Sequence, residues 1–180
     1  QVMNGVKVDS FLSTPVSSEE KRWIEKFGEL KEEIIKGARY NNITTPLDAF
    51  LTRFSAWIHA DLDALNMIEI ASGPFDAEAF EKPEARKLVD YLAKLDIWRM
   101  HLPESPPRDG DVVPIFTSKD DTHVYFYYGG GWRYLYKTAY TWLWQESLEE
   151  ELKKARDFLD EKREMGMGIG WAILFEAGFS

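Results

Sequence analysis

The chain has 180 residues, a length that fits one domain, and its 44% hydrophobic and 29% charged residues suit an apolar core with a solvated surface, which excludes a disordered chain. The formal net charge of −9 opposes binding to polyanions, and no local basic patch offsets it, so no nucleic-acid partner is expected. The absence of cysteine excludes disulfides, thiolate metal sites and a cysteine nucleophile, but it does not assign a compartment.

The N-terminal part of the chain predicts an arm and then a helix. Residues 1–16 show no hydrophobic period and predict an extended arm. Ser17 followed by Glu20 is a capping-box pattern, after which apolar residues recur at helical spacing until Gly37. The first helix is therefore expected between Ser17 and Gly37.

Two further helices complete a helical part that spans residues 17–98. Thr45 before Pro46 combines a favourable N-cap with a proline at the first helical position, and the apolar stripe that follows predicts one helix to about Ser72. Pro83 begins a third helix, which is expected to end near Trp98.

A β part follows a proline-rich connection. Residues 99–111 contain three prolines and a glycine, a composition that cannot continue a helix. From residue 112 to 145 the spacing changes to that of a three-stranded antiparallel meander, with strands Val112–Thr117, Thr122–Tyr128 and Trp132–Lys137. Because proline cannot donate a ladder hydrogen bond, Pro114 predicts that the first strand lies at an edge.

The last segments predict a C-terminal amphipathic helix over residues 146–165 and an apolar, glycine-rich tail over residues 166–180. We therefore predict a single α+β domain over residues 1–180, with an N-terminal bundle of about three helices, the meander, the C-terminal helix and the tail. No apolar run approaches the ~20 residues that a membrane-spanning helix needs. The chain is not expected to span a membrane, which leaves peripheral association with a membrane complex open.

The densest group of aromatic residues lies in and after the predicted hairpin. Neighbouring strand residues point to opposite faces, so both faces of the hairpin carry aromatic rings. Either both faces are covered, one by the N-terminal helices and one by the last helix or the tail, or one face is a binding surface. The predicted binding residues are Tyr125, Tyr127, Trp132, Tyr134, Tyr136 and Trp142, together with Trp171 and Phe175 of the tail, and Arg133 and Lys137 would add charge at the rim.

Asp61 is the weak catalytic candidate. If the second helix runs unbroken, Asp61 falls in the middle of its apolar stripe and points inward. An unpartnered carboxylate in apolar surroundings has a raised pKa, as a general acid requires, but a structural carboxylate with a partner has the same spacing.

Motifs for metals, cofactors and phosphate are absent. Gly129-Gly130-Gly131 precedes Trp132-Arg133, where a phosphate-binding loop has a lysine and a hydroxyl residue, so it predicts a turn. Asp120, Asp121 and His123 cluster at a hairpin turn, where turn chemistry alone accounts for the aspartates. We predict no metal site and no cofactor.

These observations favour a non-catalytic binding or assembly subunit of a larger complex. Its contact with a protein partner, or with a second copy, would use the aromatic hairpin and the apolar tail. Two alternatives stay open. One is a small hydrolase acting on a sugar or another neutral substrate with Asp61 as acid or base, and the other is non-catalytic binding of a sugar or pigment.

Overall fold

The computed structural model describes residues 2–3, 6–7, 12–70, 72–100, 102–103, 105–118 and 120–138, together with Lys153 and Asp157. In chain order the elements are β1 (Val2–Met3), β2 (Val6–Lys7), α2 (Ser18–Ile35), α3 (Pro46–Ile58), α4 (Leu62–Ile68), the 3-10 helix η1 (Ala77–Glu81), α5 (Pro83–Lys94), β3 (Arg99–Met100), β4 (Val112–Ser118), β5 (Asp121–Tyr128) and β6 (Gly131–Thr138). The predicted α+β class is confirmed.

The first predicted helix is confirmed at both ends. The Ser17 hydroxyl accepts a hydrogen bond from the Glu20 amide at 3.0 Å and so caps α2. After Ile35 the chain turns at Gly37, whose φ of 124° lies in the left-handed region that favours glycine. Local chemistry therefore fixes the limits of α2.

The second predicted helix begins as expected but is divided in two. Thr45 caps α3 by accepting a hydrogen bond from the Asp48 amide at 3.1 Å. The helix ends at Ile58, and Ala60 takes a φ of 52° that no helix contains. Asp61 then caps the short helix α4. The prediction of one helix over residues 46–72 is therefore wrong.

The third predicted helix begins at Pro83 but ends at Lys94, before the predicted end near Trp98. The chain that follows adds a fourth strand, β3, which pairs Arg99 with Phe116 and Met100 with Ile115. Sequence analysis assigned these residues to the connection. The pairing also makes β4 an inner strand, so the predicted edge position is wrong. The described β3–β4 pairing ends at Ile115, next to Pro114, so the proline does not have to donate a hydrogen bond to β3 there.

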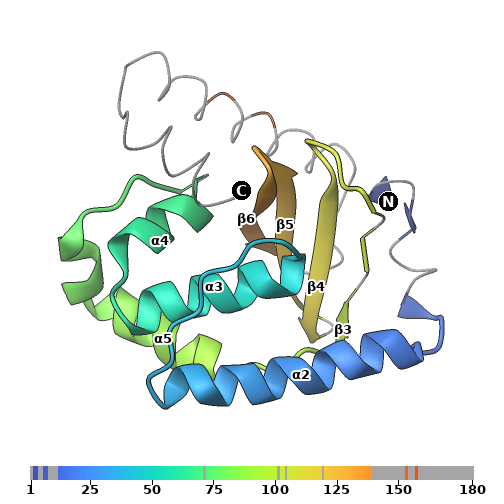
Figure 1. Ribbon diagram of the computed structural model, residues 1–180, viewed down its shortest axis with the longest axis horizontal. Helices are drawn as coiled ribbons and strands as arrows, with labels where there is room; N and C mark the ends of the chain where they lie inside the picture. The colour runs from blue at the N-terminus through green and yellow to red at the C-terminus, as the bar shows by residue number, and fades with distance from the viewer. Residues whose placement is uncertain are drawn as a thin grey trace.

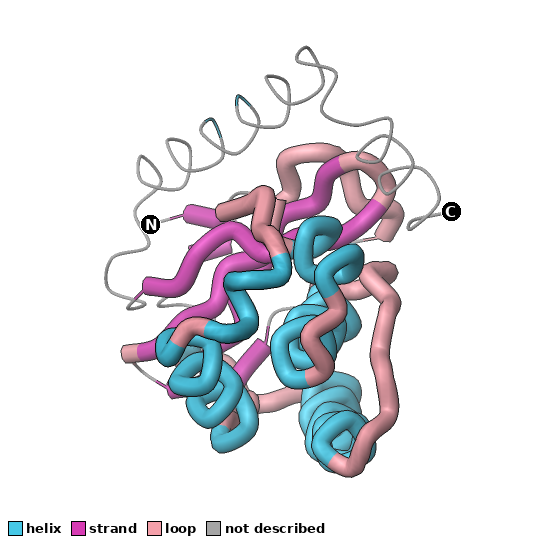
Figure 2. Tube along the Cα trace, turned by 90° about the vertical axis from the view of Figure 1, so that its left-hand side faces the viewer, coloured by secondary structure: helices cyan, strands magenta, loops and turns pink. Residues whose placement is uncertain are grey.

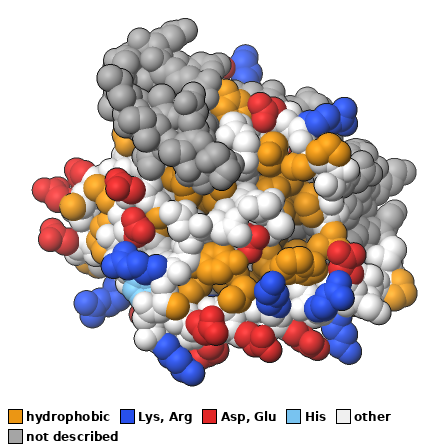
Figure 3. Space-filling view, viewed as in Figure 1, with side chains coloured by type: hydrophobic (Ala, Val, Ile, Leu, Met, Phe, Trp, Pro, Cys, Tyr) orange, Lys and Arg blue, Asp and Glu red, His pale blue; other side chains and the backbone are white. Residues whose placement is uncertain are grey.

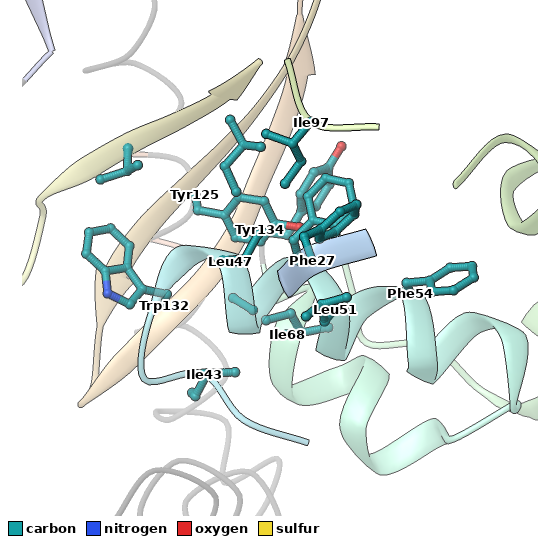
Figure 4. Packing of buried hydrophobic residues seen from close by; sticks show 14 of the residues in the cluster. Phe27, Ile43, Leu47, Leu51, Phe54, Ile68, Ile97, Tyr125, Trp132 and Tyr134 are labelled. Atoms are coloured by element: carbon teal, nitrogen blue, oxygen red, sulfur yellow. The ribbon is translucent and has the colours of Figure 1, made fainter. Parts of the chain in front are cut away.

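The three predicted strands are confirmed as β4, β5 and β6, in an antiparallel sheet of order β3-β4-β5-β6. The described helices lie to one side of this sheet (Figures 1 and 2). Helix α3 contacts β4, β5 and β6, and it is buried from Pro46 to Ala56. In the core, Leu47 and Leu51 of α3 lie beside Phe27 of α2 and Tyr125 of β5 (Figure 4).

The predicted C-terminal helix over 146–165 and the tail over 166–180 lie outside the described residues. Among the helices that the structure does describe, none has the length and apolar character needed to cross a membrane.

Candidate functional site

The helix-facing side of the aromatic hairpin is core. Tyr125, Trp132 and Tyr134 are exposed by 0%, 1% and 8% and pack against α3 and its neighbours (Figure 4). Val124 and Phe126, which point to the other face, are buried as well. Both faces of the hairpin are therefore buried at these positions, and the expectation of an exposed platform is wrong for Tyr125, Trp132 and Tyr134.

The other predicted binding residues have different positions. Tyr127 and Tyr136 are half-buried. Trp142, Trp171 and Phe175 lie outside the described residues. Arg133 does not lie at a rim, because it is fully buried and its Nη1 donates a hydrogen bond to the Met67 carbonyl at 2.8 Å.

A buried ion pair lies beneath the aromatic face, and sequence analysis missed it. Arg53 of α3 has its Nε 3.1 Å from Oε2 of Glu69, which caps the end of α4, and the indole of Trp57 donates to the same oxygen. The guanidinium also lies 3.8 Å from the ring centre of Tyr134. Burial by itself would lower the pKa of Arg53. The negative charge of Glu69 has the opposite effect, and with the neighbouring tyrosines it leaves the pKa of Arg53 raised. These groups hold α3, α4 and the sheet together.

A second polar cluster lies where α5 meets the β4–β5 turn. The Asp121 carboxylate accepts hydrogen bonds from the Tyr91 phenol and, at 2.8 Å, from the Thr117 hydroxyl. His123 Nε2 lies 3.4 Å from the same oxygen, and Lys137 Nζ lies 3.8 Å from the other. Sequence analysis noted Asp121 and His123 only as neighbours at a turn. It could not indicate that Tyr91, 30 positions from Asp121, completes the cluster.

The pKa values in this cluster follow from burial and contacts. Burial lowers the pKa of His123, and the positive charge of Arg53 adds to this effect, while Asp121 opposes it. Burial of Asp121 favours its neutral form, but hydrogen bonds from His123, Tyr91 and Thr117 outweigh that and hold its pKa well below its ordinary value. The cluster therefore contains an ionised Asp121 and a neutral His123 near neutral pH. It is held by its own contacts, and within the described residues no group of three or more His, Asp or Glu could bind a metal ion.

Asp61 does not point into an apolar stripe. Its Oδ1 accepts a hydrogen bond from the Ala64 amide at 3.2 Å, its Oδ2 lies 3.8 Å from Arg39 Nη1, and its side chain is 33% exposed. The helix break at Ala60 rotates it out of the stripe, so the geometric reason for considering it a general acid is removed.

An apolar pocket of about 330 Å³ lies between α2, the start of α3 and the connection after β3. Hydrophobic side chains gather in the middle of the face that carries these elements, above a row of charged side chains along α2 (Figure 3). The pocket is lined by Glu19, Trp23, Thr44, Thr45, Pro46, Leu47, Met100, Leu102, Pro103, Ser105, Pro107 and Trp132. Sequence analysis missed this pocket, although it placed Trp132 among the binding residues.

The threonine hydroxyls of the pocket wall are already bonded within the protein. The Thr44 hydroxyl donates to Asn42 at 2.6 Å, and the Thr45 hydroxyl donates to Asp48 at 2.9 Å. The indole of Trp132 differs, because no described residue accepts a hydrogen bond from its Nε1, and this atom is not among the buried polar atoms closed off from solvent. The pocket therefore combines apolar side chains with a few polar groups open to a ligand, namely the indole N–H of Trp132 and the exposed side chains of Ser105 and Glu19.

The wall formed by β3 is held by a buried ion pair. Arg99 Nε lies 2.9 Å from Glu20 Oε2 of α2, and the same oxygen accepts a hydrogen bond from the Met100 amide at 2.9 Å. On the opposite side, the Trp132 amide donates to the Ile43 carbonyl at 2.9 Å. The pocket is therefore built between fixed elements before any ligand binds.

Fold and site together define an α+β domain with a preformed apolar pocket. In comparisons with known proteins, no family model, no curated protein and no solved structure matches the chain.

Proposed function

We propose that the chain is a non-catalytic binding or assembly subunit that holds an apolar group of its partner in the pocket between α2, α3 and the connection after β3. The observation that carries the proposal is the lining of this pocket, in which Trp23 and Trp132 occur together with Pro103 and Pro107 of the connection after β3. Fixed aromatic walls of this kind supply contact area at little entropic cost.

The carboxylates buried near the core support a non-catalytic role. Glu20 is paired with Arg99, Glu69 with Arg53, and Asp121 with Tyr91 and Thr117. Each is committed to a structural partner, whereas a general acid or base must reach a substrate proton. The hydrolase alternative has lost its geometric basis at Asp61.

Binding of a plain apolar probe tests the pocket. Toluene added to ¹⁵N-labelled protein should shift the indole N–H resonances of Trp23 and Trp132 in a saturable way. Thr44→Trp, at an exposed position of the pocket wall, should fill the pocket and abolish the shifts. Glu29→Trp is the matched control, since Glu29 is exposed on α2 and does not line the pocket. Shifts that persist in Thr44→Trp, or that never saturate, would overturn the proposal.

The contact through the apolar tail stays part of the proposal and concerns residues outside the described part of the chain. Light scattering of the full chain and of a chain truncated after Arg163 tests it. Self-association of the full chain that disappears on truncation supports a tail interface. A monomeric full chain that unfolds on truncation would assign the tail to the core and leave the pocket as the contact site.

A further inference from the structure

The ligand of the pocket can be described further, and this description rests on the proposed function. We propose that the pocket binds a proline-rich, extended segment of a protein partner, with an apolar side chain between Trp23 and Trp132 and a backbone carbonyl of the segment accepting a hydrogen bond from Trp132 Nε1.

The free indole donor is the first argument. Trp132 is 1% exposed, yet its Nε1 has no acceptor among the described residues and is not closed off from solvent. The indole lies beside the chain that leads from Ile43 to Leu47 (Figure 4), and Trp132 and Leu47 both line the pocket. Since this donor is open to solvent, a carbonyl of a ligand in the pocket would take the place of water as its acceptor.

The second argument concerns the form of the ligand. The hydroxyls of Thr44 and Thr45 donate within the protein, so the side-chain donors that the pocket offers a ligand are the Trp132 indole and the exposed Ser105 hydroxyl, beside apolar side chains and Glu19. A residue in an extended peptide presents an apolar side chain and a free carbonyl close together. In the polyproline II conformation the backbone carbonyls have no internal hydrogen bonds, and aromatic walls are a recurrent surface for such segments.

The third argument is charge. Glu19 is exposed in the first turn of α2 and lines the pocket. A basic residue next to the apolar side chain of the partner would lie close to this carboxylate. Such an exposed pair adds little affinity, but it sets the direction in which the segment binds.

The probe is the peptide acetyl-Pro-Pro-Leu-Pro-Pro-Arg-amide, titrated by calorimetry and by NMR of the indole N–H groups. The variant Trp132→Phe keeps an aromatic ring but removes the donor, so it should weaken the affinity for the peptide about tenfold more than the affinity for toluene, which has no hydrogen-bond acceptor. Glu19→Gln should weaken the affinity for this peptide by no more than about fivefold. It should not change the affinity for the matched peptide in which leucine replaces the final arginine.

The outcomes separate this inference from the proposed function. If toluene binds and the peptide does not, or if Trp132→Phe binds the peptide as well as the parent chain does, the inference is overturned and the pocket proposal stands. If a free amide such as N,N-dimethylacetamide binds to the parent chain and more weakly to Trp132→Phe, while the peptide does not bind, the pocket takes a small amide and the inference of a protein segment is wrong. If neither toluene nor peptide binds, both proposals fall. The urea denaturation midpoint of Trp132→Phe, compared with that of the parent chain, shows whether this variant is folded.

Discussion

The phenol of Tyr91 on α5 donates a hydrogen bond to the carboxylate of Asp121 on β5, although the two residues lie 30 positions apart. The rings of Tyr91 and His123 are stacked with centres 6.0 Å apart, and Lys137 Nζ lies 4.8 Å from the centre of the Tyr91 ring. This cluster joins the helical part to the sheet, so its members should contribute to stability out of proportion to their partial exposure.

Tyr91→Phe tests that bond. The change keeps the ring and removes the donor, which leaves Asp121 with Thr117, His123 and Lys137 as partners. We expect the free energy of unfolding to fall by about 1 kcal/mol, below the full value of a charge-assisted bond because the site is partly exposed. Urea denaturation at pH 7.5 measures it, and an unchanged midpoint would show that the bond contributes nothing.

Tyr125→Phe should raise the free energy of unfolding, whereas Tyr91→Phe should lower it. The Tyr125 hydroxyl is buried in the core, and within the described part of the chain it has no hydrogen-bond partner. Removing it relieves the cost of burying an unsatisfied polar group, so we expect stabilisation by about 1 kcal/mol. The two tyrosine variants form a matched pair under the same denaturation conditions. A loss of stability in Tyr125→Phe would reveal an ordered water or another partner at the hydroxyl.

The pH dependence of stability should reflect His123. Burial lowers its pKa below the ordinary 6.5, so between 6.5 and the folded value the unfolded chain takes up a proton that the folded chain refuses. Stability should therefore fall as the pH drops below 6.5, by up to about 1.4 kcal/mol per pH unit for this group. Asp121, whose folded pKa lies below its ordinary 3.8, adds a further loss only below that pH.

His123→Phe isolates that contribution. The variant retains a ring against Phe50 and Tyr91 but cannot titrate. Denaturation of both proteins at pH 7.5, 6.5 and 5.5 should show a shallower decline for the variant, whatever its stability at pH 7.5. Parallel curves would mean that His123 is protonated in the folded state as readily as in the unfolded one.

The Arg53–Glu69 pair should show strong coupling. Their side chains are 7% and 4% exposed, so removing one charge leaves the other buried without its partner. Glu69→Gln and Arg53→Met should each lower the free energy of unfolding by about 3 kcal/mol or more. The double variant should lose much less than the sum, because no unpaired charge remains. Additive losses would indicate that each group acts through separate contacts.

Asp61 should behave as a helix cap. Asn is as good an N-cap as Asp, so Asp61→Asn should leave stability nearly unchanged, while Asp61→Ala should lower it by about 1 kcal/mol. Thermal unfolding of both variants measures this. An equal loss of stability in Asp61→Asn and Asp61→Ala would point to the charge of Asp61, and hence to its pair with Arg39, as the main contribution.

Sequence patterns predicted the parts of the fold that depend on neighbouring residues. Ser17 and Thr45 cap α2 and α3, and the alternating residues after Val112 form the strands, because caps and strand periodicity act over a few residues. The break at Ala60 was missed because the apolar spacing continues across it. The two-residue strand β3 was missed because its pairing with Phe116 and Ile115 gives the local sequence no period.

The sequence by itself thus determined the α+β class, the first residues of α2, α3 and α5, and the aromatic character of the hairpin. Only the tertiary structure decided which aromatic rings are core and where the pocket lies, because burial depends on which elements meet. Arg53 is paired with Glu69, Asp121 with Tyr91 and Arg99 with Glu20. Each of these three partners lies 16 or more positions away in the chain, so no local pattern indicates it. The same holds for Trp23 of α2 and Trp132 of β6, which lie far apart in the chain and line one pocket only in the folded structure.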